Sequence, residues 1–197
     1  MYFDDVAIKW DDKRRCERAQ ILSAELKKEW NGREVVVLDF GCGTGLLTYA
    51  LYPYAAAIYG YDTSIEMQKV FQLKREMYHA DNVTLATAEK VKESTFDVIF
   101  SSMVFHHIID VKAKIAELKK SLAPDGLFMW IDLDEEDGSF HKNEPDFHGY
   151  NGFSRKEVQN ILQDCSFHEI SIKTIYQGEK IIENEPIAYS LFLATAR

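Results

Sequence analysis

The stretch VVVLDFGCGTG, from Val35 to Gly45, joins an unbroken apolar run to an acid and three alternating glycines. The apolar run has the length and composition of a fully buried strand, and a helical pattern begins directly after the last glycine. Glycines at a strand-to-helix turn allow positive φ and a close approach of another molecule to the backbone. Two interpretations follow: a tight turn alone, or a turn that carries a cofactor.

The spacing of the glycines separates two kinds of cofactor. A dinucleotide-binding turn has the pattern Gly-x-Gly-x-x-Gly, in which the third glycine lets the helix pack closely on the strand. Here the third glycine, Gly45, comes one position early, and Leu46 stands where that glycine is expected. The stretch therefore disfavours a nicotinamide cofactor, and a dehydrogenase is kept only as a third alternative.

Composition limits the class of protein. The chain has 197 residues and a formal charge of -9 at pH 7, so we expect one globular domain over residues 1–197 and no nucleic-acid partner. The acidic N-terminus does not resemble a signal peptide, and no apolar run is long enough to cross a bilayer, so no membrane partner is expected. Cys16, Cys42 and Cys165 are odd in number and far apart, which fits a reducing, cytoplasmic compartment. The oligomeric state is not indicated.

Short apolar runs alternate with segments of helical period, a pattern typical of a mostly parallel sheet with helices on both faces. The expected strands are residues 35–40, 56–61, 83–86, 96–101, 127–133, 168–176 and 187–196. The expected helices are residues 12–30, 46–51, 65–79, 111–122 and 155–163. The prediction is a doubly wound, seven-stranded α/β fold.

Two helices carry start signals, and the end of the chain departs from simple alternation. Thr63 with Glu66, and Ser154 with Glu157, each form the Ser/Thr-x-x-Glu capping pattern. After the last helix, two strand-like runs are separated only by the turn-prone residues 177–186, so this pair is expected to be antiparallel. The sequence thus predicts a mostly parallel sheet with an antiparallel last strand.

Several motifs occur in the order found in one enzyme family. VLDFGCGTG joins the first strand to the glycine turn, YDTSIEM ends the second strand at Asp62, and FDVIFSSMVFHHI covers the fourth strand and its loop. LAPDGLFMWID and HGYNGFSRKEVQNILQDCSFHEI follow. Together they resemble class I S-adenosylmethionine-dependent methyltransferases, especially the small-molecule branch that includes the quinone-biosynthesis methyltransferases. The resemblance runs from Ala7 to the C-terminus and implies a Rossmann-like fold, S-adenosylmethionine as cofactor and S-adenosylhomocysteine as product.

The resemblance implies a set of cofactor-binding residues around the first two strands. Asp62 would accept hydrogen bonds from both ribose hydroxyls, and Asp39 would orient the glycine loop and face the methionine amino group. Met67 is expected to pack against adenine, although a methionine at helical spacing suits the core equally well. The expected residues in this region are Asp39, Gly41, Cys42, Gly43, Gly45, Asp62, Thr63 and Met67.

After the third strand the sequence departs from the family. Relatives often have Asp-Ala-Glu there, with the aspartate reaching the adenine amino group, whereas this chain has Thr87, Ala88 and Glu89. Thr87 is too short to repeat that contact, so adenine recognition is expected to rest on the Ala88 backbone and on apolar packing. Ser101, at the carboxyl end of the fourth strand, also belongs to the expected cofactor set.

His106 and His107 follow the fourth strand as an adjacent pair. Neighbouring side chains point in different directions, and no carboxylate or cysteine stands at a spacing that completes a metal site, so we predict no metal. In relatives with a similar pair the histidines mainly shape the pocket floor, and packing is the alternative for both. The resemblance places His106 in the substrate pocket and His107 at the methionine end of the cofactor.

Methyl transfer from a sulfonium requires an acceptor that is held in line and dry. A general base is needed only when the acceptor must lose a proton, and His141 and His148 are the candidates for that base or for acceptor positioning. Both lie in residues 134–153, a connection long enough to suggest a substrate lid, with a solvated loop as the alternative.

Residues 1–33 precede the first strand and are not required by a doubly wound sheet. Tyr2, Phe3 and Trp10 give this segment an apolar start. Relatives carry a similar aromatic and Trp-Asp stretch that closes over the cofactor, so Trp10 is assigned to the substrate pocket within an N-terminal helical flap. An ordinary helix that covers the sheet edge is the alternative.

The sequence therefore predicts a cytoplasmic S-adenosylmethionine-dependent methyltransferase that acts on a small molecule. A protein that binds the cofactor or a nucleoside without transferring methyl, as a sensor or partner module, is an alternative of a different class. No residue pattern indicates the acceptor or its accepting atom.

Overall fold

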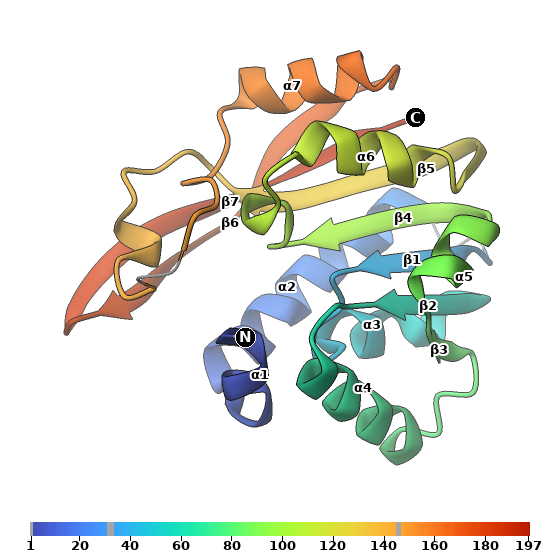
Figure 1. The fold of residues 1–197 in the computed structure, drawn as a ribbon, viewed down its shortest axis with the longest axis horizontal. Coiled ribbons are helices and arrows are strands. Elements are labelled where there is room, and N and C mark those ends of the chain that lie inside the picture. The colour runs from blue at the N-terminus through green and yellow to red at the C-terminus, as the bar shows by residue number, and fades with distance from the viewer. Residues whose placement is uncertain (1, 31–33, 145–146) are drawn as a thin grey trace. The chain divides into compact units, whose positions relative to one another are not determined.

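The computed structural model describes residues 2–30, 34–144 and 147–197 (Figure 1). The predicted flap and lid also include residues 1, 31–33 and 145–146, which lie outside the described residues. By its internal contacts the chain divides into two compact units, Met1–Phe100 with Ser121–Leu127 and Ser101–Lys120 with Phe128–Arg197. We refer to them as the first unit and the second unit.

The strands form a seven-stranded sheet in the order β3-β2-β1-β4-β5-β7-β6. Their bounds are β1 Val36–Phe40, β2 Ala57–Tyr61, β3 Val83–Leu85, β4 Phe96–Ser102, β5 Leu122–Leu133, β6 Ser171–Ile182 and β7 Glu185–Ala196. β1 pairs in parallel with β2 and β4, β2 pairs in parallel with β3, and β7 is antiparallel to β5 and β6. The predicted Rossmann-like sheet with an antiparallel last strand is confirmed.

Five helices match the predicted ones to within a few residues. They are α2 Lys13–Trp30, α3 Leu46–Leu51, α4 Ile65–Met77, α6 Val111–Lys119 and α7 Arg155–Asp164. Short elements escaped the prediction because one or two turns show no clear period. These are α1 Tyr2–Val6, α5 Ala88–Glu93 and the 3-10 turns η1 Ala7–Lys9, η2 Tyr52–Tyr54, η3 Phe105–His107 and η4 Ser139–His141.

Each unit has an apolar core of its own. In the first unit, Leu38 and Phe71 are fully buried, as expected for a strand and a helix face that are covered. In the second unit, the Trp130 ring contacts the rings of Phe105 and Phe153 edge to face, with centroids 5.2 and 4.9 Å apart. This packing fixes β5, which carries Asp132 beside Trp130 into the same buried region.

The prediction of a long turn over residues 177–186 was wrong. β6 and β7 continue through it as an antiparallel ribbon and are joined by Glu183 and Asn184 alone (Figure 1). These two residues have φ of 52° and 67°, the left-handed geometry whose twist suits a two-residue hairpin. The polar residues that suggested a loop, such as Gln177 and Glu179, alternate with less exposed ones along β6.

One predicted helix cap is confirmed and the other lies one residue further on. At α7, Ser154 Oγ accepts from the Glu157 backbone N–H at 3.3 Å, and the Glu157 carboxylate accepts from the Ser154 N–H at 2.9 Å. At α4 the cap is Ser64, whose Oγ accepts from the Met67 N–H at 3.3 Å, and Thr63 is exposed. Because α4 begins at Ile65, as predicted, the residue directly before it is Ser64 and not Thr63.

We expect Ser154→Ala to destabilise the protein by about 1 kcal/mol, because it removes the hydroxyl that accepts from the Glu157 N–H and donates to the Glu157 carboxylate, while the bond from the backbone N–H of residue 154 remains. For a chain of this size that corresponds to a fall in melting temperature of roughly 2–4 °C. Thermal unfolding followed by circular dichroism measures it. Ser154→Thr, which keeps the hydroxyl, should melt like the wild type, and an unchanged melting temperature in the alanine variant would show that the cap contributes nothing.

Candidate functional site

The loop between β1 and α3 carries the three glycines. Gly41, Gly43 and Gly45 have φ of 78°, 53° and 83°. The Gly41 N–H donates to the Tyr61 carbonyl at 2.7 Å, and the Gly45 N–H donates to the Cys42 carbonyl at 2.8 Å. The loop is therefore a tight turn that is fastened to the end of β2.

Two of these glycines differ in what surrounds them. A Cβ at Gly45 would lie 2.5 Å from the Tyr49 ring and 2.9 Å from the Phe71 ring, so packing alone requires glycine there. The nearest atoms to a Cβ at Gly43 are Met67 Sδ and Trp10 Nε1, both at 4.0 Å. The protein thus leaves room at Gly43, which a tight turn does not need and a bound molecule does.

Asp62, at the end of β2, faces the same loop. Its Oδ2 accepts from the Gly43 N–H at 2.8 Å, and its Oδ1 accepts from the Ser64 N–H at 2.9 Å. Each carboxylate oxygen has a second lone pair, so both retain capacity for another donor. The carboxylate is held in one orientation and fits the pair of hydroxyls on a ribose.

Asp39 lies on β1 and is only 2% exposed. Its Oδ2 accepts from Thr48 Oγ1 at 2.6 Å. Burial raises the pKa of Asp39 to about 7; the charge of Asp62 adds to this rise, and the Thr48 hydroxyl opposes it. A buried carboxylate with so little compensation suits a cationic partner, such as the ammonium group of a methionine moiety.

This buried acid gives the empty protein a pH dependence. The folded-state pKa, about 7, lies above the ordinary value of 3.8, so the contribution to stability is complete below about pH 4 and is lost as the pH rises to about 7. We expect Asp39→Asn to gain melting temperature relative to the wild type across that window and to hold the gain at higher pH. Thermal melts at a series of pH values measure it. A difference between the two proteins that does not change with pH would contradict it.

The N-terminal segment is docked on the glycine loop and on α4. Asp11 Oδ1 accepts from Thr44 Oγ1 at 2.5 Å, and its other oxygen pairs with the Lys74 ammonium group. Asp4 Oδ1 accepts from Ser64 Oγ at 2.6 Å, and α1 lies beside α4 (Figure 1). Neither carboxylate was among the predicted site residues, although the Trp-Asp pair at positions 10 and 11 is a signal for one of them.

Trp10 packs against Arg15 and borders the open space at Gly43. The Arg15 guanidinium lies 4.0 Å from its ring centroid, a cation–π geometry, and its indole Nε1 borders the open space at Gly43. Met67, which is 1% exposed, borders the same space with its sulfur. The structure therefore brings Trp10, Gly43 and Met67 together.

The other predicted residues of the first unit are not among those that border the space at Gly43. Cys42 is buried, and burial raises the pKa of its thiol well above the usual range, so the thiol stays protonated. Thr87 is exposed and caps α5, where its Oγ1 accepts from the Lys90 N–H at 3.2 Å. Ala88 is the first residue of that helix, and Glu89 is exposed. The hydroxyl at position 87 is thus used for a helix cap.

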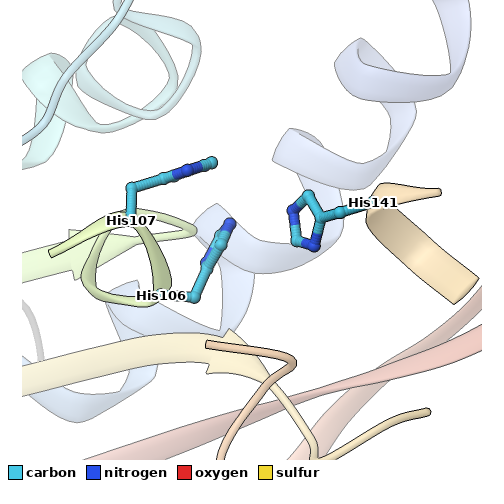
Figure 2. Close-up of side chains that lie close together, drawn as sticks. All are labelled: His106, His107 and His141. Atoms are coloured by element: carbon cyan, nitrogen blue, oxygen red, sulfur yellow. The ribbon is translucent and has the colours of Figure 1, made fainter. Parts of the chain in front are cut away.

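The second unit holds the other predicted residues. Ser101 is fully buried on β4, His106 and His107 form most of η3, and His141 ends η4. His148 is exposed. The ring centroid of His106 lies 4.0 Å from that of His107 and 5.1 Å from that of His141. Figure 2 shows the three side chains. Three predicted residues therefore form one cluster that His148 does not join.

Burial sets the charge state in this cluster. Desolvation is the largest cause that lowers the pKa of His107 and of His141 to about 3 each, and the proximity of His106 and Lys180 adds to it. Both rings are neutral at pH 7. A base with such a low pKa accepts a proton weakly, which counts against the predicted general-base role of His141.

A wide-open pocket of about 800 Å³ also lies in the second unit. It is lined by Asp134, Glu135, Glu136, Gln177, Gly178, Glu179, Ala188, Tyr189 and Ser190. Its volume is that of a small-molecule site, and its carboxylates suit a cation rather than an anion. None of the predicted site residues lines it. Within the described residues, no helix is both long and apolar enough to cross a bilayer.

Comparison with known proteins finds similarity to methyltransferases. A family model described as a methyltransferase domain matches residues 10–172. An uncharacterised methyltransferase of Schizosaccharomyces pombe is 29% identical over 163 residues, 73% of this chain and 57% of that protein. A ubiquinone biosynthesis O-methyltransferase of Bartonella quintana is 33% identical over 94 residues, 46% of this chain and 38% of that protein.

Solved structures agree on the fold. The crystal structure of a SAM-dependent methyltransferase from Aquifex aeolicus matches with a TM-score of 0.69 and 23% identity, over 98% of this chain and 97% of that one. The chain spans less than two thirds of the length of either curated relative.

Proposed function

The chain belongs to the methyltransferase domain family, and from this membership we propose that it transfers the methyl group of S-adenosylmethionine to a small-molecule acceptor and releases S-adenosylhomocysteine. The observation that carries the cofactor half of the proposal is the space at Gly43. It adjoins a backbone N–H that already orients the Asp62 carboxylate at 2.8 Å. An adenosine cofactor needs both features together, a close backbone approach and an acid for its ribose.

Bound S-adenosylmethionine supplies an activated methyl group on a sulfonium. The protein would bind and orient the cofactor and the acceptor and exclude water from them. Asp62, oriented by the Gly43 and Ser64 N–H groups, would accept from the ribose hydroxyls, and the buried Asp39 would accept from the ammonium group. The Ala88 N–H, in the first turn of α5, is the proposed contact to adenine because the Thr87 hydroxyl is engaged in the cap.

The acceptor is proposed to be a small molecule rather than a nucleic acid. A formal charge of -9 disfavours a phosphate backbone. One relative is named for ubiquinone biosynthesis, which agrees with a small acceptor. The roles of Ser101 and His107 at the cofactor, of Trp10 and His106 in the pocket, and of His141 and His148 as base or positioning groups stay predictions. The free thiols Cys16, Cys42 and Cys165 agree with the proposed cytoplasmic location.

The test is turnover of methyl-labelled S-adenosylmethionine by the purified protein with a metabolite extract. We expect S-adenosylhomocysteine to form only when the extract is present, with label in the small-molecule fraction. Asp62→Ala is the control for contaminating activity. Label in precipitated protein or RNA would overturn the small-molecule acceptor. Cofactor binding without any turnover would favour the sensor or partner module instead.

A further inference from the structure

The cluster of His106, His107 and His141 has the composition and spacing of a metal site. One ring nitrogen from each residue lies within 4.8 Å of the other two. Figure 2 shows the three rings directed toward a common space, two from η3 and one from η4, all within the second unit. Imidazole nitrogen is a ligand that zinc and similar divalent ions prefer in proteins.

We propose that these three histidines bind a divalent transition-metal ion of the zinc type, with a fourth coordination position open to an exogenous ligand. Three protein ligands and one open position are typical of catalytic rather than structural zinc sites. With Zn–N bonds of about 2.0 Å, tetrahedral ligand nitrogens lie roughly 3.3 Å apart. The observed separations, up to 4.8 Å, therefore require the rings to close by about 1.5 Å, within reach of small χ rotations.

Asp132 provides the outer support that metal-bound histidines usually have. It is fully buried and accepts from the Leu133 N–H at 2.9 Å and from the His106 backbone N–H at 3.2 Å. The His106 Nδ1 lies 2.5 Å from the same carboxylate. A carboxylate only accepts, so Nδ1 carries the hydrogen, and the neutral ring in this tautomer has its lone pair on Nε2 for a ligand. A carboxylate that fixes the tautomer in this way is a recurrent feature of zinc sites.

His141 supplies the second supporting observation. Its side chain is 5% exposed, and among the described residues its Nδ1 is buried without a hydrogen-bond partner. The ring is stacked on Phe147, with centroids 3.7 Å apart and planes 8° from parallel. A buried ring nitrogen without a partner is unfavourable, and the stacking keeps it from turning outward to water. A metal ion would satisfy it.

Lys180 is the group that opposes a cation here. Its Nζ donates to the Phe140 carbonyl at 2.7 Å, next to His141 in the chain, and its charge disfavours protonation of His107 and His141. Glu144 pairs with this ammonium at 3.2 Å, so much of its field is compensated. The negative charge of the buried Asp132 carboxylate is then available to stabilise a divalent ion at the three histidines.

The alternative is a purely packed cluster, in which the imidazoles stack on one another and on Phe147. It predicts no metal affinity beyond the weak binding of exposed histidines. The two explanations therefore differ in a quantity that does not involve methyl transfer, and failure of the metal proposal would leave the proposed function untouched.

The test is titration of chelator-treated full-length protein with Zn²⁺ by calorimetry and with Co²⁺ by visible absorption. We expect one equivalent to bind, with the intense absorption of tetrahedral cobalt. His107→Ala and His141→Phe should each weaken binding at least tenfold; the phenylalanine keeps the stacking on Phe147 and so protects the fold. Asp132→Asn should weaken binding by roughly 10- to 100-fold, as outer-shell changes do.

His148→Ala is the matched control, since that histidine is exposed and lies in the same connection as His141. It should bind metal like the wild type. The proposal is overturned if the wild type takes up no metal, or if His141→Phe and His107→Ala bind as tightly as His148→Ala. Melts of the metal-free variants establish that each is folded before titration.

Discussion

Asp62→Ala is expected to lower the affinity for S-adenosylhomocysteine by about 30- to 150-fold. The charged acceptor of two ribose hydroxyls is lost, which costs about 2 to 3 kcal/mol. The orientation of the carboxylate in the protein supports this magnitude, because two backbone N–H groups, from Gly43 and Ser64, hold it in place before any ligand arrives. Calorimetric titration of the purified variant measures the change.

Asp62→Ala also removes the two hydrogen bonds from Gly43 and Ser64, so its effect on stability must be measured apart from its effect on affinity. Without them the empty variant should be destabilised by about 1 kcal/mol, so its melting temperature is measured first and the titration is run well below it. Asp81→Ala is the control, since Asp81 is an exposed acid of the same unit that lies before β3. An affinity in Asp62→Ala equal to that of Asp81→Ala would remove Asp62 from the site.

Gly43→Ala and Gly45→Ala are expected to fail in different ways. Both place a side chain at positive φ, which costs about 1 to 2 kcal/mol. At Gly45 the new methyl also meets the Tyr49 ring at 2.5 Å, and overpacking of this kind adds about 1 to 3 kcal/mol. We expect Gly45→Ala to lower the melting temperature by roughly 5–15 °C.

Gly43→Ala should melt only roughly 2–6 °C below the wild type, because its methyl finds space between Met67 and Trp10. That space is where the cofactor is proposed to approach the backbone, so affinity for S-adenosylhomocysteine should fall at least tenfold. Wild-type affinity in a folded Gly43→Ala protein would mean that the glycines make only a turn. The two variants thus distinguish a glycine loop that is only a tight turn from one that also carries a cofactor.

The sheet was predictable because the signals that define it are local. The apolar run at residues 36–40 and the short runs like it are buried strands whatever their partners. The end of β6 was not predictable in this way. Gln177 and Glu179 are polar, yet they pair with β7 because register, set by the turn at Glu183 and Asn184, decides which side chains face outward.

The position of Asp62 at the glycine loop was predictable from spacing, and the histidine cluster was not. Asp62 and the glycines are joined by a hydrogen bond between neighbouring strand ends, which the order of parallel strands implies. His141 stands 34 positions after His107, with β5 and the start of the predicted lid between them. No spacing rule spans such a gap, so the absence of a nearby third ligand led to the prediction of no metal. The role of Thr87 could not be predicted from its residue type, because the same hydroxyl can cap a helix or contact a ligand.

The docking of the N-terminal segment changes how variants of this chain should be interpreted. Asp4 and Asp11 contact Ser64, Thr44 and Lys74, all in the glycine loop or at α4. Asp11 therefore holds the Thr44 hydroxyl of that loop from more than thirty positions earlier in the chain. In a hydrogen-exchange experiment, loss of either carboxylate would speed exchange in the loop while the strands stay protected. A substitution of Asp4 or Asp11 would then resemble a mutation in the proposed cofactor site, although both residues are far from that site in the sequence.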